Sequence, residues 1–162
     1  MGGLRFPAKA LHEEVGARKF VLVGIGLIGC TPNAVSNQSR NGSYCDEEKN
    51  NAAFMFNVKL KSLVDNFNNN FYSDSKFIFI NSTAGTLDSS LGFTVSNASC
   101  CPSGTNGFCV PNETPCENRT TYVFWDQFHP TESVNQIVAI SSYNGSNPAF
   151  TYPMDITHLV QS

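Results

Sequence analysis

The sequence has neither a run of basic residues nor a long apolar run, and these absences exclude two kinds of partner. Its ten lysines and arginines are scattered and its formal net charge is -3 at pH 7, so it lacks the electropositive footprint of a protein that binds nucleic acid or anionic membranes. No apolar stretch approaches the roughly 20 residues that a bilayer-spanning helix needs. Hydrophobic residues make up 41% of the 162 residues, which is typical of a globular domain, or part of one, rather than of a disordered chain.

The cysteines include no C-x-x-C pair and have no pair of histidines near them, so we expect no zinc site and no cofactor. Their even number and close spacing instead predict local disulfides formed in an oxidising compartment. A bridge between Cys30 and Cys45 would close a polar surface loop. The other four cysteines admit three pairings, and they are Cys100, Cys101, Cys109 and Cys116.

Seven Asn-x-Ser/Thr sites without an intervening proline predict N-glycosylation, and together with the cysteines they predict a secreted, extracellular protein. Asn81 ends a predicted strand, so we expect burial to limit its modification. The first ten residues contain neither the apolar segment nor the small-residue cleavage site of a signal peptide, so the chain shows no export signal. The sites begin at Asn37, Asn41, Asn81, Asn97, Asn112, Asn118 and Asn144.

Two short apolar runs separated by a long amphipathic segment predict a strand, a helix and a second strand. Phe20–Ile25 has the β-branched, unbroken apolar pattern of a strand buried on both faces of a parallel sheet. Residues 46–71 begin with acidic side chains that favour a helix N-terminus, and Phe77–Ile80 is the second strand. This order predicts a right-handed βαβ crossover, with functional sites at the carboxyl ends of the strands. The predicted buried stripe of the helix is Ala53, Phe56, Leu60, Leu63, Phe67 and Phe71.

Other segments have local patterns that predict structure rather than chemistry. Gly24, Gly26 and Gly29 match the spacing of a dinucleotide-binding loop, but they run into a polar loop and not into a helix, so no nucleotide is expected. Residues 83–91 are expected to form a short helix, which makes Ser89 and Ser90 ordinary helix residues. Leu11–Val15 followed by Gly16 predicts the last turn of a helix with a glycine cap, on which His12 is expected to be exposed. Helical spacing also predicts a helix after His129, through Val134, Ile137, Val138 and Ser141.

An aromatic-rich stretch from Tyr122 to Glu132 contains the most suggestive chemistry of the chain. Asp126 precedes His129 by three residues, so its carboxylate can accept the Nδ1 proton in a tight turn and leave Nε2 free to take a proton from a hydroxyl. Pro130 favours an extended backbone at His129 and can occupy the first position of the following helix. The stretch therefore predicts a catalytic acid–base pair at a junction between a loop and a helix.

The same spacing also occurs in ordinary surface pairs, so the surroundings have to decide between the two interpretations. The cysteine-bearing loop of residues 92–119 can hold the chain that leads into Tyr122. Asp155 and His158 repeat the spacing without an aromatic frame or a pre-organised turn, and we interpret them as a surface pair.

Five separated stretches together resemble the plant GDSL-type esterase/lipase family of the SGNH hydrolases, in the order in which that family carries them. The resemblance runs from about Leu11 to the C-terminus, and Leu27 stands where the family usually has a proline. The stretches are the strand at residues 16–23, the G-P-x-G-C-x-P-like turn at 26–32, the paired Cys100 and Cys101, the final block at 124–131 and the ending at 152–156.

The resemblance implies an α/β fold, namely a three-layer α/β/α domain with a parallel sheet that is incomplete at the N-terminus. Residues 1–162 would then form the C-terminal part of a single hydrolase domain. The implied reaction is hydrolysis of a carboxylic ester bond in a lipid or other small acyl ester by a Ser-His-Asp mechanism. Asp126 would orient His129, which would act first as general base and then as general acid.

The family's nucleophilic serine and the glycine and asparagine of its oxyanion hole have no counterpart in this sequence, so we expect the chain alone to be inactive. An alternative is a catalytically silent, secreted glycoprotein fragment that binds a lipid or a protein through exposed apolar surface. A cysteine-held lectin-like module is disfavoured by the pattern of buried strands and helix. The oligomeric state, the disulfide pairing and the acyl chain of the substrate stay open.

Overall fold

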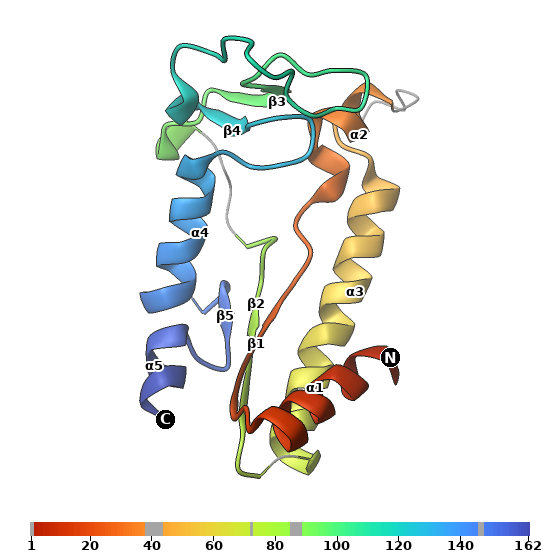
Figure 1. The fold of residues 1–162 in the computed structure, drawn as a ribbon, viewed down its shortest axis with the longest axis vertical. Helices are drawn as coiled ribbons and strands as arrows, with labels where there is room; N and C mark the ends of the chain where they lie inside the picture. The colour runs from red at the N-terminus through yellow and green to blue at the C-terminus, as the bar shows by residue number, and fades with distance from the viewer. Residues whose placement is uncertain (1, 38–43, 72, 85–88, 146–147) are drawn as a thin grey trace.

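The computed structural model describes residues 2–37, 44–71, 73–84, 89–145 and 148–162. In these residues the chain forms helices, short strands and several single turns of helix (Figure 1). The helices are α1 (Gly2–Val15), α2 (Pro32–Ser36), α3 (Glu47–Asn66), α4 (Glu132–Asn144) and α5 (Ile156–Gln161), with short helical turns η1 (Ile28–Cys30), η2 (Phe67–Phe71), η3 (Ser89–Leu91) and η4 (Arg119–Thr121). The strands are β1 (Lys19–Val23), β2 (Lys76–Ile80), β3 (Val95–Ser99), β4 (Tyr122–Phe124) and β5 (Thr151–Tyr152).

The strands form two small sheets. β1 and β2 pair in parallel from Lys19 opposite Lys76 to Val23 opposite Ile80, and α3 lies between them in the chain, which confirms the predicted order of strand, helix and parallel strand. β5 adds to β2 in the antiparallel direction, so the sheet is mixed in a way that the sequence did not predict. β3 and β4 pair in parallel as a separate sheet at the end of the molecule opposite α1 (Figure 1).

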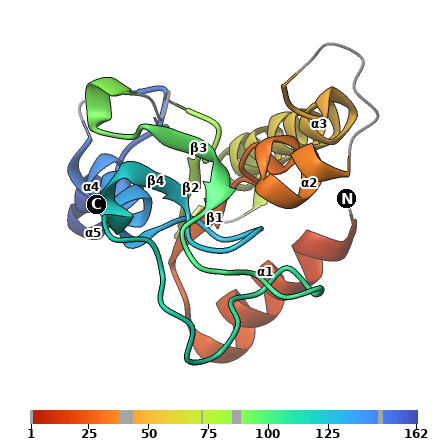
Figure 2. The same cartoon turned by 90° about the horizontal axis from the view of Figure 1, so that it is seen from above.

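The core lies where α3 crosses β1 and β2, and phenylalanine rings fill its centre. The rings of Phe20 and Phe77 stack with their centroids 4.3 Å apart, and Phe67 packs on Phe77 at 4.7 Å. α5 contacts the same two strands, so helices cover β1 and β2 from more than one side (Figures 1 and 2). Leu60, Leu63 and Val64 of α3 complete this cluster.

The apolar stripe predicted for α3 is wrong at Phe56, and the side chain of Phe71, which was also part of the prediction, lies outside the described residues. Phe56 is 39% exposed, whereas its polar neighbour Asn57 is only 5% exposed. The side chain of Asn57 accepts a hydrogen bond from the N–H of Ile25 and donates one to its carbonyl, both at 2.8 Å. An amide that satisfies both backbone groups of one residue can be buried at little cost, and it ties the end of β1 to α3.

β1 was predicted to be buried on both faces, and the structure corrects this. Phe20 is buried, but Val21 and Val23 are 41% and 57% exposed. β1 lies at the edge of the described sheet, next to β2 alone. One face of β1 therefore presents apolar side chains to the surroundings, and its outer edge has no partner strand among the described residues.

Two smaller predictions are also corrected. His12 is not an exposed helix residue, because its side chain is only 16% exposed and its Nε2 lies 2.8 Å from Oδ1 of Asp74. The helix predicted for residues 83–91 is limited, in the part of the chain that the structure describes, to the single turn η3, and residues 85–88 lie outside the described residues. The glycine cap after Val15 is confirmed, since Gly16 has a φ of 76°.

All six cysteines are paired. The predicted bridge between Cys30 and Cys45 is present, and of the three pairings open to the rest the structure has Cys100 with Cys116 and Cys101 with Cys109. Adjacent cysteines thus hold two different parts of one loop. Among the described residues no helix is long and apolar enough to cross a bilayer.

Candidate active site

The loop that joins β4 to α4, residues 125–130, carries the predicted acid–base pair and is closed by backbone hydrogen bonds. The N–H of Trp125 donates to the carbonyl of His129 at 2.8 Å, and the N–H of Thr131 donates to the carbonyl of Val123 at 2.9 Å. Pro130 was predicted to open the helix, but α4 begins at Glu132 with Thr131 as its N-cap. The Thr131 hydroxyl donates to the Tyr122 carbonyl instead of capping α4, so it fastens the helix start to β4.

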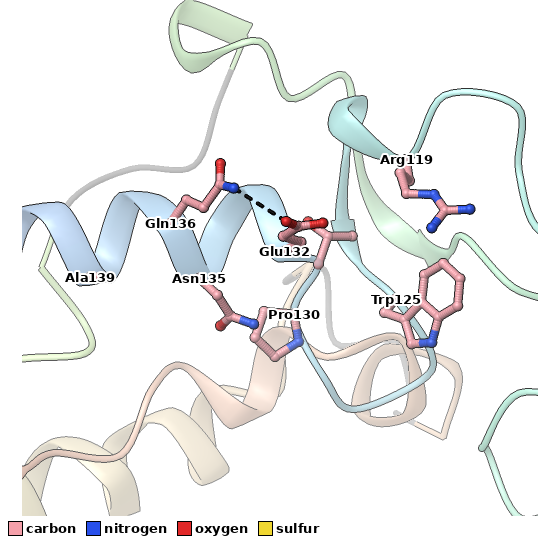
Figure 3. Close-up of a pocket in the computed structure, with 8 residues that line it drawn as sticks. Arg119, Trp125, Pro130, Glu132, Asn135, Gln136 and Ala139 are labelled. Carbon is pink, nitrogen blue, oxygen red and sulfur yellow. Dashed lines mark hydrogen bonds between the residues drawn. The ribbon is translucent and has the colours of Figure 1, made fainter.

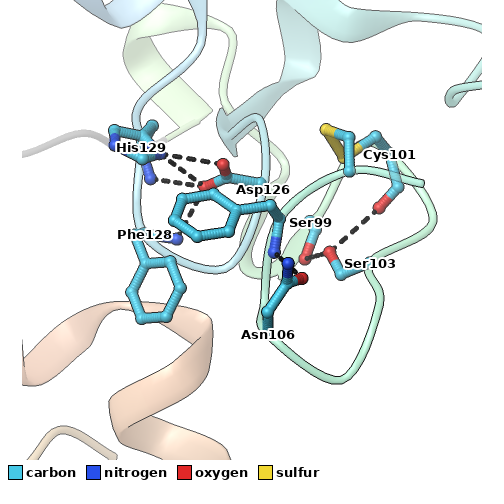
Figure 4. Close-up of polar contacts among 9 residues, drawn as sticks. Ser99, Cys101, Ser103, Asn106, Asp126, Phe128 and His129 are labelled. Atoms are coloured by element: carbon cyan, nitrogen blue, oxygen red, sulfur yellow. Dashed lines mark hydrogen bonds and ion pairs between the residues drawn. A yellow bond between two sulfur atoms is a disulfide. The ribbon is translucent and has the colours of Figure 1, made fainter. Parts of the chain in front are cut away.

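Asp126 and His129 lie in the hydrogen-bonded arrangement that the sequence predicted (Figure 4). Nδ1 of His129 is 2.8 Å from Oδ2 and 3.0 Å from Oδ1 of Asp126. The same Oδ1 accepts the backbone N–H groups of Phe128 at 2.8 Å and His129 at 2.7 Å. Since a carboxylate can only accept, Nδ1 carries the proton, and in the neutral form of the imidazole Nε2 is left with its lone pair.

The two side chains differ sharply in exposure. The Asp126 side chain is 6% exposed and that of His129 is 62% exposed, so the carboxylate belongs to the interior and the imidazole faces outward. Burial raises the pKa of Asp126 and is the largest single influence on it. The N–H groups of His129 and Phe128, with the His129 side chain, outweigh burial and hold that pKa below its ordinary value. Asp126 therefore stays ionised and keeps the imidazole oriented.

Two separate segments hold this loop in place through three backbone hydrogen bonds. From α2, the N–H of Asn33 donates to the carbonyl of Gln127 at 3.2 Å. From the cysteine-bearing loop, the N–H of Cys101 donates to the carbonyl of Trp125 at 3.0 Å, and the N–H of Gln127 donates to the carbonyl of Gly107 at 3.1 Å. The disulfide-bridged loop thus bonds to the residues on either side of Asp126. The sequence predicted only that this loop holds the chain leading into Tyr122.

Asp155 and His158 form a second pair with the same local geometry. Nδ1 of His158 lies 2.7 Å from Oδ1 of Asp155, which also accepts the N–H of His158 at 2.9 Å. The backbone N–H and then the side chain of His158 lower the pKa of Asp155. The expected lack of a pre-organised turn is wrong, because Asp155 is buried and caps α5. The His158 side chain is 67% exposed, so this end of the pair does lie at the surface. Geometry within an Asp-x-x-His pair does not by itself define a catalytic site.

A pocket of about 560 Å³, with Pro130 in its lining, was not predicted (Figure 3). The Arg119 guanidinium lies over the Trp125 ring at 5.3 Å from its centroid, and Gln136 donates to Glu132 at 3.3 Å. Neither Asp126 nor His129 lines the pocket within the described residues. Its lining consists of Arg119, Trp125, Pro130, Thr131, Glu132, Asn135, Gln136 and Ala139.

No described hydroxyl is hydrogen-bonded to Nε2 of His129. Ser89 and Ser90 are exposed residues of the η3 turn, and Ser99 and Ser103 bond to one another, with their hydroxyl oxygens 3.2 Å apart (Figure 4). The described residues also contain no group of three or more histidine, cysteine or acidic side chains that could hold a metal ion. What the site offers is a proton acceptor oriented by a buried carboxylate.

Comparisons with known proteins define the class. The family model described as GDSL-like Lipase/Acylhydrolase matches residues 5–141, so the chain belongs to this family. It is 48% identical over 154 residues to GDSL esterase/lipase At1g29670 of Arabidopsis thaliana, a match that covers 90% of this chain and 42% of that relative. Two other Arabidopsis relatives, GDSL esterase/lipases At1g29660 and At4g18970, are each 46% identical with the same coverage. The chain thus spans less than half the length of these relatives.

Proposed function

We propose that this chain supplies the histidine and aspartate of a Ser-His-Asp ester hydrolase that acts on a lipid or other acyl ester. The observation that carries the proposal is the buried Asp126 carboxylate bound to Nδ1 of an outward-facing His129. In this mechanism Nε2 takes the proton of a serine hydroxyl as its oxygen attacks the ester carbonyl. The protonated imidazole is stabilised by Asp126 and then gives the proton to the departing alcohol. A water molecule then attacks the acyl group on the serine, with His129 again acting first as base and then as acid.

The nucleophilic serine and the oxyanion-hole glycine and asparagine belong, in this proposal, to a segment outside residues 1–162. The chain would be the C-terminal part of a single three-layer α/β/α domain whose parallel sheet continues beyond β1. The exposed Val21 and Val23 on that edge, and relatives more than twice the matched length, support this arrangement. Since loss of a catalytic serine costs about a millionfold in turnover in a comparable hydrolase, the chain alone is expected to be inactive.

A second candidate is a catalytically silent secreted glycoprotein that binds a lipid or a protein. It is favoured by the apolar side chains on the outer face of α3, where Phe54, Met55 and Val58 are 62%, 59% and 50% exposed. Secretion is common to both candidates and is supported by the three disulfides and the Asn-x-Ser/Thr sites.

The deciding experiment restores the missing segment. The part of GDSL esterase/lipase At1g29670 that this chain does not match is placed before residue 1, which gives a protein called here the joined enzyme, and hydrolysis of a small acetate ester is measured. We expect turnover that His129→Ala lowers by about 10⁵-fold or more. His158→Ala is the matched control, because it removes the histidine of the second pair, and it should change turnover less than twofold.

Turnover that survives His129→Ala, or that falls equally in both variants, would refute the role of His129. The chain by itself is treated in parallel with a serine-reactive fluorophosphonate. Covalent labelling at Ser89 or Ser90 would contradict the assignment of the nucleophile to another segment. An inactive joined enzyme that still binds lipid vesicles through the α3 face would favour the second candidate.

A further inference from the structure

Two exposed phenylalanine rings stand beside the imidazole of His129. The ring centroid of Phe108 lies 6.0 Å from that of His129, with the two planes only 25° apart, and 5.7 Å from that of Phe128. Phe108 is 49% exposed and Phe128 is 37% exposed. Phe128 lies next to the pair in Figure 4. The proton acceptor therefore has an open apolar wall on one side.

Backbone contacts fix the positions of the two phenylalanine rings that form this wall. Gly107 has a φ of 81°, and a Cβ on it would lie 2.5 Å from the Phe128 ring, so the ring rests directly on the glycine. The N–H of Phe108 donates to Oδ1 of Asn106 at 3.1 Å, and its carbonyl accepts the N–H of Gly104 at 2.9 Å. The turn that carries Phe108 is therefore ordered before any ligand arrives, which lowers the entropy cost of binding.

The disulfide between Cys101 and Cys109 closes this turn, and Cys109 directly follows Phe108. The N–H of Cys101 donates to the carbonyl of Trp125, in the same loop as His129. Phe108 is thus fixed relative to the imidazole by one covalent bridge and by the backbone bonds on both sides of it.

We propose that Phe108 and Phe128 form the subsite for the apolar part of the ester's alcohol group. This inference rests on the proposed function. When the carbon–oxygen bond of the tetrahedral intermediate breaks, its electron pair stays on the alcohol oxygen, which takes the proton that Nε2 received from the serine. The leaving oxygen must therefore reach hydrogen-bond distance of Nε2, and the carbons attached to it lie alongside the imidazole, where the two rings are.

The test compares two acetate esters in the joined enzyme, benzyl acetate and ethyl acetate. Phe108→Ala is expected to lower kcat/KM for benzyl acetate about tenfold, and to change that for ethyl acetate less than twofold. Phe108→Leu should restore most of the lost rate, because it keeps apolar volume. Tyr143→Ala, which removes a 59% exposed aromatic ring from the far end of α4, is the control and should alter neither ester.

Equal loss on both esters, or no loss on either, would overturn the subsite. So would a loss that instead grows with the acyl chain when ethyl acetate is compared with ethyl hexanoate. These outcomes are distinct from failure of the proposed function, in which His129→Ala would leave hydrolysis of ethyl acetate intact.

A second measurement uses the 162-residue chain as it stands and needs no turnover. Benzyl alcohol is titrated into the chain while the ring protons of His129 are followed by NMR. We expect saturable shifts at millimolar ligand that Phe108→Ala abolishes and that ethanol does not produce. An unshifted His129 signal, or shifts that persist in Phe108→Ala, would contradict the subsite.

Discussion

At the scale of single residues, Asp126 performs two tasks with one carboxylate. One oxygen accepts the backbone N–H groups of Phe128 and His129, and both oxygens lie within hydrogen-bond distance of the imidazole. The first task shapes the turn and the second selects the tautomer. Substitutions that separate these tasks are therefore informative.

Asp126→Asn keeps the size of the side chain and an oxygen that can still accept the turn's N–H groups. Its amide cannot keep the proton on Nδ1 as a carboxylate does, so Nε2 would often carry the proton and fail as a base. We expect kcat of the joined enzyme to fall about 10⁴-fold with KM nearly unchanged. Asp155→Asn is the control, and steady-state kinetics that rank the two variants equally would contradict the assigned role.

The lowered pKa of Asp126 predicts that this carboxyl contributes to a loss of stability in acid. A carboxyl whose pKa is lower when folded stabilises the protein fully at pH values well above its ordinary pKa of 3.8, and this contribution is lost as the pH falls towards the folded value. Urea unfolding of the chain between pH 6 and pH 2.5 should show this loss. Asp126→Asn should make the free energy of unfolding depend less on pH below about pH 4. Glu113→Gln, at an exposed loop position, should leave this dependence unchanged. A curve unaltered by Asp126→Asn would contradict the argument.

At the scale of elements, the site depends on contacts that cross between segments far apart in the chain. The turn after β1 is bound to α3 through Asn57, and through Asn50, whose Oδ1 accepts the N–H of Gly29 at 2.9 Å. Any Cβ at Gly29 would lie 2.0 Å from the carbonyl oxygen of Asp46, so the turn fits only without a side chain there. α2 follows this turn, and its Asn33 reaches the loop of His129.

Asn57→Ala is expected to destabilise the chain by about 2 kcal/mol, because it leaves a partly buried N–H and a carbonyl of Ile25 without partners. Asn57→Asp should not restore this stability, because one carboxylate oxygen can accept the N–H but the other would face the Ile25 carbonyl oxygen and the charge would be buried. Chemical denaturation measures both. Phe56→Ala, one position along the helix and more exposed, should cost less than Asn57→Ala, and the reverse order would contradict this account of α3.

These elements also show what could be predicted from the sequence. Unbroken apolar runs identified β1 and β2, and the spacing of Asp126 and His129 identified the pair, because each signal is local. Asn57 was missed because apolar periodicity ignores polar residues that bond to backbone. Phe108 and Gly107 were missed because their importance depends on a cysteine pairing that spacing left open among three choices.

At the scale of the whole molecule, the asparagines of the Asn-x-Ser/Thr sites differ in their exposure to solvent. Asn81 is half-buried, and its Nδ2 donates to the carbonyl of Ala149 at 3.1 Å, so a glycan on that nitrogen would break a contact within the fold. Asn97 and Asn112 lie on exposed positions of the described surface. The Asn41 site and parts of the Asn37 and Asn144 sites lie outside the described residues.

Expression in a eukaryotic secretory host should therefore give unequal occupancy. We expect peptide mass mapping to find glycans at Asn97 and Asn112 in most molecules and at Asn81 in few. Digestion with a glycan-removing amidase in heavy-oxygen water marks each site that was occupied, and an untreated sample is the control. High occupancy at Asn81 in folded protein would contradict the proposed link between burial and modification.

The unequal exposure of Asp126 and His129 has an evolutionary consequence. Replacement of the exposed imidazole would remove proton transfer and disturb little of the fold, whereas replacement of the buried carboxylate would loosen the turn as well. In lineages of this family that no longer hydrolyse esters, selection on folding alone would preserve the aspartate after the histidine has been replaced by another residue. A related protein that keeps the counterpart of Asp126 but not that of His129 would thus be expected where catalytic activity has been lost.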